Sequence, residues 1–239
     1  MHKILEPELK LMVINYLLEN GTFTENDTVI NEFTIDKYSR RVDLALVKTN
    51  RLFAYEIKSN SDSLTRLNGQ VTKYLEYFDK VTVITAPKHT LKALNSTPAN
   101  VAIWEVDIDT IKVIRRGRSI LITDKYKFLQ LMTATELAKL ARQHKLSVSL
   151  QRRKVFEQNL IYLPISTIRK YTLNFLRERY KKNNVRFFES LKNSRLSNTK
   201  DLKLLRSEHT NEIKSKQFTA VNSLISTLDL LKDEIEKKS

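Results

Sequence analysis

The apolar positions of the first half of the chain change spacing several times, and each change predicts an element. Residues 8–19 carry apolar side chains three and four positions apart, which predicts a helix that ends before Gly21. Strand-like apolar runs follow at residues 29–35, 42–47, 52–58, 81–86 and 101–106. A second helical stripe covers residues 63–78, and residues 111–114 and 119–123 are predicted to pair as a hairpin around Gly117. This order of elements predicts a mixed α/β fold.

The second half of the chain has a different pattern. All three glycines lie before residue 118, and beyond it Pro164 is the one remaining proline, which favours helices. Helices are predicted near residues 135–142, 166–182 and 218–235, the last with an apolar stripe suited to a bundle or a partner helix. We therefore expect an α/β domain over residues 1–122 and an all-helical domain over residues 123–239.

Composition excludes several classes of protein. The chain has no cysteine, so disulfide scaffolds, thiolate zinc fingers and cysteine nucleophiles are ruled out. The apolar runs are far shorter than the roughly 18–20 residues that a membrane span needs, and the first residues do not read as a secretory signal. We expect a cytoplasmic protein without a membrane partner.

Charge is distributed unevenly along the chain. Residues 1–110 hold 13 Lys and Arg against 15 Asp and Glu, a net charge of −2, whereas residues 111–239 hold 29 against 12, a net charge of +17; the whole chain has a formal charge of +15. A basic region beside a near-neutral one indicates a polyanionic partner, most often nucleic acid. Charge that serves only solubility remains the alternative.

Three charged residues interrupt the apolar strands at 42–47 and 52–58. Glu56 and Lys58 are two apart and share one face of the sheet. With a turn at residues 49–50, opposed positions sum to 99, so Asp43 lies opposite Glu56. Opposed carboxylates, with Cβ atoms about 4.5–5.5 Å apart, repel each other unless a cation lies between them. The pattern predicts a site for an oxygen-preferring ion such as Mg²⁺; a salt-bridge set with Arg41 and Lys58 is the alternative.

Asp43 followed by Glu56-Ile57-Lys58 resembles the PD-(D/E)XK nuclease superfamily over about residues 1–115, with Val42 in place of the proline. Gln70 and Tyr74 resemble the Gln-x-x-x-Tyr motif of its RecB-like branch, although they would also suit a solvated helix face. The stretch is most similar to small uncharacterised bacterial members, and more loosely to MmcB-type DNA-repair proteins.

The resemblance implies a restriction-endonuclease-like mixed sheet flanked by helices. It also implies that Asp43, Glu56 and the main-chain carbonyl of Ile57 hold Mg²⁺ or Mn²⁺ and that Lys58 assists the attacking water. Gln70 and Tyr74 would shape the site. Acidic residues at further positions of this superfamily make Glu32 and Glu8 additional candidate ligands.

The basic half supplies candidate contacts to nucleic acid. These are Arg152, Arg153 and Lys154 in one cluster, and Arg169, Lys170 and Arg177 on the predicted helix that begins at Ser166. The latter suits a helix-turn-helix, although ordinary helical bundles share the pattern. The last helix is a candidate surface for a homodimer or another protein.

We therefore expect a metal-dependent nuclease that hydrolyses phosphodiester bonds of nucleic acid, with DNA favoured over RNA and RNA left open. A catalytically silent nucleic-acid-binding or regulatory protein with the same fold is the first alternative, and a purely structural interaction module is the second.

Overall fold

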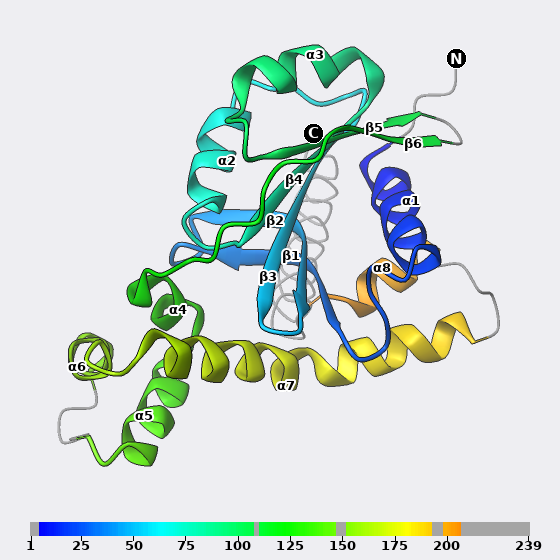
Figure 1. Cartoon of the computed structure of the whole chain (residues 1–239). Coiled ribbons are helices and arrows are strands. Elements are labelled where there is room, and N and C mark those ends of the chain that lie inside the picture. Colours follow the sequence, from blue (N-terminus) through cyan, green and yellow to red (C-terminus); the bar gives the residue numbers. More distant parts are fainter. Residues whose placement is uncertain (1–4, 108–109, 147–151, 193–197, 207–239) are drawn as a thin grey trace, which may run out of the picture. The chain divides into compact units, whose positions relative to one another are not determined.

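The computed structural model describes residues 5–107, 110–146, 152–192 and 198–206, and it contains one six-stranded sheet flanked by helices (Figure 1). The strands are β1 (Thr28–Ile35), β2 (Arg40–Lys48), β3 (Arg51–Lys58), β4 (Lys80–Thr85), β5 (Ala102–Asp107) and β6 (Thr110–Arg115). The helices are α1 (Glu6–Glu19), α2 (Leu67–Tyr74), α3 (Pro87–Ser96), α4 (Lys125–Leu131), α5 (Ala134–Gln143), α6 (Arg153–Leu160), α7 (Ile165–Leu191) and α8 (Asp201–Leu204). The predicted mixed α/β class followed by a helical region is confirmed.

The strands lie in the order of the sequence, but their directions are mixed. β1, β2 and β3 form an antiparallel meander, β3, β4 and β5 are parallel, and β6 returns antiparallel to β5. In the β2–β3 hairpin, Ala45 pairs with Ala54 and Lys48 pairs with Arg51. The register predicted from the turn is therefore confirmed for this hairpin.

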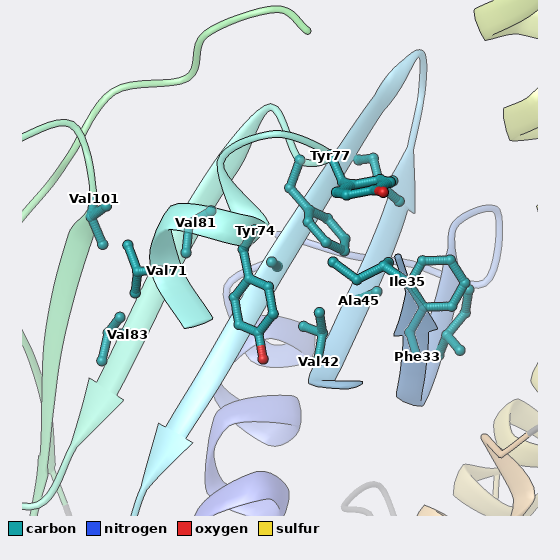
Figure 2. Close-up of a cluster of buried hydrophobic side chains, with 14 of the residues drawn as sticks. Phe33, Ile35, Val42, Ala45, Val71, Tyr74, Tyr77, Val81, Val83 and Val101 are labelled. Atoms are coloured by element: carbon teal, nitrogen blue, oxygen red, sulfur yellow. The ribbon is translucent and has the colours of Figure 1, made fainter. Parts of the chain in front are cut away.

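Each face of the sheet has its own apolar core. On one face, side chains of α2 and α3 pack on the strands together with part of α7. Figure 2 shows Tyr74 and Tyr77 near Val42 and Ala45, and Val71 beside Val81 and Val83. On the other face, α1 buries Leu9, Val13, Ile14 and Leu17 against Leu44, Tyr55 and Ile57. The sheet is thus covered on both sides, and the apolar spacing of residues 8–19 is explained by the second core.

Helix α7 covers the outer edge of β1. The Asn184 side chain accepts a hydrogen bond from the Val29 amide at 2.9 Å and donates one to the Val29 carbonyl at 3.0 Å. The Leu205 carbonyl accepts from the Asn31 amide at 3.0 Å. An uncovered strand edge is a template for unwanted pairing with other chains, so these contacts protect β1.

A buried ion pair also joins the helices to the sheet. Arg169 on α7 is 2% exposed and pairs with Asp79, whose carboxylate also accepts the Leu52 amide at 2.8 Å and the Ile122 amide at 3.0 Å. The predicted separation of residues 1–122 from the rest is accordingly not what the contacts display. The sheet and the helices up to Leu205 form one compact unit, because α7 packs in both cores.

Several predicted elements have different bounds. Helix α2 begins at Leu67 and not at Ser63, and α3 was not predicted. The last hairpin is formed by β5 and β6, and residues 119–123 contain no strand. The predicted helix at 218–235 lies outside the described residues. In the part of the chain that the structure describes, no helix is both long and apolar enough to cross a membrane.

Candidate active site

Glu56 is the centre of a buried polar cluster at the end of β3. Its side chain is 2% exposed, and it accepts hydrogen bonds from Lys58 Nζ at 2.7 Å and Gln70 Nε2 at 2.6 Å on Oε1. Tyr74 Oη lies 2.9 Å from Oε2 and 2.8 Å from the Arg41 carbonyl oxygen, so its single proton is shared between the two acceptors. Four of the five residues predicted from the sequence to form the catalytic set therefore converge here: Glu56, Lys58, Gln70 and Tyr74.

The placement of Gln70 and Tyr74 follows from the helix that carries them. They are one turn apart on α2, so both side chains point to the same side. Figure 2 shows the Tyr74 ring reaching down from α2 over the sheet, with its hydroxyl near Val42 at the start of β2. Burial, followed by the charge of Glu56, raises the pKa of the Tyr74 hydroxyl, so it stays a proton donor to the carboxylate.

Asp43 adjoins this cluster from the neighbouring strand. Its Oδ2 accepts the Ile57 amide proton at 2.8 Å, across the β2–β3 hairpin. Burial and the negative charge of Glu56 raise the pKa of Asp43 to about 7. Two carboxylates are therefore close enough for their charges to repel, as predicted from the hairpin register.

Lys10 is a residue of the site that the sequence analysis missed. It lies on α1 with 3% of its surface exposed, and its ammonium is 2.7 Å from Glu6 and 3.7 Å from Asp43. Its positive charge opposes the upward shift of the Asp43 pKa. The only signal in the sequence is a lysine next to the buried Leu9 of an apolar stripe, which by itself does not indicate a partner on β2.

Glu32 and Glu8 do not join the two carboxylates. Glu32 is on β1 with φ of 59° and lies 3.6 Å from Arg41, while Glu8 accepts the Leu5 amide proton at 2.8 Å at the start of α1. Within the described ranges, no group of three or more His, Cys, Asp or Glu side chains is arranged to hold a metal. That either residue is an additional metal ligand stays a prediction.

The remaining donor set still suits a hard cation. Asp43 and Glu56 supply carboxylate oxygens, and Ile57, between Glu56 and Lys58, supplies a main-chain carbonyl, which is the type of ligand that Mg²⁺ and Mn²⁺ prefer. Burial and, after it, repulsion from Glu56 raise the pKa of Asp43, and a divalent ion between the two carboxylates would remove the repulsion.

The predicted nucleic-acid contacts fall into two groups. Arg152, Lys154 and Lys170 are exposed. Arg169 is instead buried against Asp79, so the prediction that it contacts nucleic acid is corrected. The Arg153 and Arg177 side chains also bind other parts of the protein. Arg153 donates to the Leu129 and Met132 carbonyls at 2.9 and 2.8 Å, and Arg177 donates to the Thr49 carbonyl.

The chain was compared with known protein families. The family described as "Bacteriophage P4 protein cII" matches residues 1–206. The chain belongs to this phage P4 cII family. Protein cII of Enterobacteria phage P4 is 31% identical over 205 residues, a region that covers 84% of this chain and 77% of the relative. The match to the cII family ends at residue 206, one residue after the compact unit, and it includes every residue of the candidate active site.

A solved structure is also similar to this cII-family chain. It is the SPO1766 protein of unknown function from Silicibacter pomeroyi, with 18% identity and a TM-score of 0.40, and the alignment covers 59% of this chain and 92% of the other.

Proposed function

We propose that this cII-family protein is a metal-dependent nuclease that hydrolyses phosphodiester bonds of nucleic acid, with DNA as the first substrate to test. The observation that carries the proposal is the buried Glu56 carboxylate, held by Lys58 and Gln70 at 2.7 and 2.6 Å beside the coupled Asp43 carboxylate. These residue types are the ones to which the PD-(D/E)XK resemblance assigns metal binding, water activation and positioning, and their convergence supports the proposal.

The residues of the site have distinct tasks. Asp43, Glu56 and the Ile57 carbonyl would hold Mg²⁺ or Mn²⁺, which supplies Lewis acidity and a lowered pKa for bound water. Lys58 is 8% exposed and provides a fixed positive charge for the phosphate and the attacking water. Gln70 and Tyr74 orient Glu56 by donating to different oxygens, and Lys10 holds Asp43 from α1.

Charge supports a nucleic acid as the substrate. The excess of Lys and Arg lies after residue 110, and Arg152, Lys154 and Lys170 are exposed there. Phosphate contacts of this kind give affinity without sequence preference and weaken as salt increases. The cytoplasm, where such a substrate is available, is the compartment we propose.

The proposal is tested with plasmid and single-stranded DNA, incubated with the protein and Mg²⁺, Mn²⁺ or EDTA. Wild type is expected to cut with metal and not with EDTA, and Glu56→Gln is expected to lose cutting. Glu76→Gln is the matched control, because Glu76 is also a carboxylate bound by lysines, namely Lys73 and Lys127, but lies outside the cluster. Equal loss in both variants, or cutting that persists in Glu56→Gln, would refute the assignment.

A catalytically silent nucleic-acid-binding protein is the second candidate. The observation that favours it is that both oxygens of Glu56 already accept hydrogen bonds from side chains, one of them in an ion pair with Lys58. In that case wild type binds DNA at low salt, leaves it intact with either metal, and melts at the same temperature with and without Mg²⁺.

A further inference from the structure

A cavity of about 360 Å³ opens on the sheet face that α1 covers, beyond the C-terminal half of that helix. Four of its lining residues are aromatic and two are lysines: Tyr16, Phe53, Tyr55, Trp104, Lys48 and Lys80. Among the described residues that line it, none is acidic. The volume lies in the range of ligand-binding pockets, and the lining combines flat apolar surface with positive charge.

The sheet register explains how these side chains come together. Phe53 on β3 pairs with Lys80 on β4, so a ring and an ammonium lie side by side on neighbouring strands. Trp104 on β5 contacts Tyr16 of α1 and Tyr55 of β3, with ring centroids 5.6 and 6.0 Å apart. Strands β3 and β5 and helix α1 therefore supply the aromatic side chains, and β4 between the two strands supplies Lys80 (Figure 1 places α1 beside this face).

The two lysines differ in how their charge is used. Lys48 donates to the Thr22 carbonyl and lies 4.0 Å from Asp27, so much of its charge is compensated. The Lys80 side chain is half-buried, and among the described residues its ammonium has no hydrogen-bond or ion-pair partner. Burial lowers the pKa of its ammonium, which means that an anion placed beside it would be favourable.

We propose that this cavity binds one nucleotide of single-stranded nucleic acid, with the base against Phe53 and Trp104 and a phosphate at Lys80. Aromatic side chains stack on unpaired bases of any identity, and lysines in the same groove follow the backbone. Bases inside a duplex are already stacked on one another, so the cavity selects single strands.

The cavity can be placed relative to the proposed nuclease site, and only this step of the inference rests on the proposed function. Phe53 is three residues before Glu56 on β3, roughly 10 Å along the strand, and the alternation of side chains along a strand directs the two to opposite faces of the sheet. Phe53 packs in the core beside α1, whereas Glu56 is bound by Gln70 and Tyr74 of α2. Tyr16 is six residues after Lys10 on α1, roughly 9 Å along a helix. A nucleotide in the cavity would therefore lie on the other face of the sheet from Glu56, and it would be separate from the scissile phosphate.

The test uses the fluorescence of Trp104, which is the only tryptophan of the chain. The full-length protein is titrated in EDTA, so that cleavage does not enter, with an oligodeoxythymidylate of about ten nucleotides, with thymidine monophosphate and with a DNA duplex. The oligonucleotide is expected to quench Trp104 at least about tenfold more tightly than the mononucleotide, and the duplex is expected not to quench.

Two variants with matched controls locate the binding. Phe53→Ala is expected to weaken quenching by about tenfold, since stacking on one ring contributes about 1–3 kcal/mol per base, while Leu91→Ala on exposed α3 has no effect. Lys80→Gln is expected to reduce the slope of log affinity against log salt by about 0.7, the value for one phosphate contact on a single strand. Lys92→Gln, also on α3, leaves it unchanged.

Circular dichroism establishes that each variant is folded, and Lys80→Gln keeps the test valid if Phe53→Ala unfolds. The proposal is overturned if the oligonucleotide does not quench Trp104, if the duplex or mononucleotide quenches equally, or if Phe53→Ala and Lys80→Gln both bind like wild type. Quenching without any cleavage in Mg²⁺ would support the cavity and refute the nuclease, so the two failures are distinguishable.

Discussion

Lys58 Nζ lies 2.7 Å from Glu56 Oε1, and the two residues are neighbours on one face of β3. Both are almost fully buried, with 8% and 2% of their surfaces exposed. A buried ion pair contributes little net stability, because the desolvation of both charges offsets much of their attraction. Its location beside Asp43 is more readily understood if both charges serve a reaction.

The hydroxyl of Tyr74 provides a test of how the site holds its carboxylate. Tyr74→Phe removes the donor to Glu56 Oε2 but keeps the ring, so we expect a stability loss of about 1–3 kcal/mol and a decrease in cleavage rate of about tenfold. Urea unfolding and single-turnover cleavage measure the two effects.

Tyr77→Phe is the control for this variant. Tyr77 is equally buried, but its hydroxyl donates to Gln130 and Asp36. It is expected to lose stability and keep the wild-type rate. Equal rate losses in both variants would mean that the effect of Tyr74 is not specific to the site.

The carboxyl of Asp43 predicts a pH dependence of stability. Its pKa is raised from 3.8 to about 7, so between these values the folded protein retains a proton that the unfolded chain has released. The contribution of Asp43 is therefore most favourable below about pH 4 and is lost as pH rises to 7, with a slope of at most about 1.4 kcal/mol per pH unit.

Asp43→Asn isolates this contribution. The free energy of unfolding, measured in EDTA from pH 4.5 to 8, is expected to fall more steeply with pH in wild type than in the variant. Mg²⁺ is expected to stabilise wild type more at pH 8 than at pH 5, because binding needs the ionised carboxylate. Parallel profiles for the two proteins would contradict the assigned shift.

Arg169 and Lys170 are adjacent on α7 but have opposite environments, which makes them a matched pair. Arg169→Met leaves Asp79 buried without its cation and is expected to cost about 3–5 kcal/mol of stability. Lys170→Met is expected to leave stability within about 0.5 kcal/mol and to weaken DNA binding at low salt. Thermal melts measure stability and filter binding measures DNA affinity. A loss of stability in Lys170→Met, with weaker DNA binding in a stable Arg169→Met, would contradict these assignments.

The features of the fold and of the site that the sequence predicts are those that depend on residues close together along the chain. The β2–β3 hairpin was predictable to the residue, because a short even-length turn and the pairing of Ala45 with Ala54 determine one register. Gln70 and Tyr74 were predictable as a pair because helical spacing places them on one side of α2.

The missed features depend on packing between distant segments. Lys10 meets Asp43 only because α1 packs on that face of the sheet, and Arg169 meets Asp79 across 90 residues of sequence. A run of basic residues does not reveal which member is buried. Helix α3 was missed although Pro87 occupies its first turn, which is a recognised start signal.

The central claim, that Asp43, Glu56 and Lys58 form a nuclease site, is tested most directly by single-turnover cleavage of single-stranded DNA by wild type and Lys58→Met, with bound DNA measured in the same reaction. The account predicts that wild type cuts with Mg²⁺ or Mn²⁺, and that Lys58→Met binds equally but cuts about a hundredfold more slowly. Wild-type protein that binds the strand and leaves it intact with either metal would contradict it.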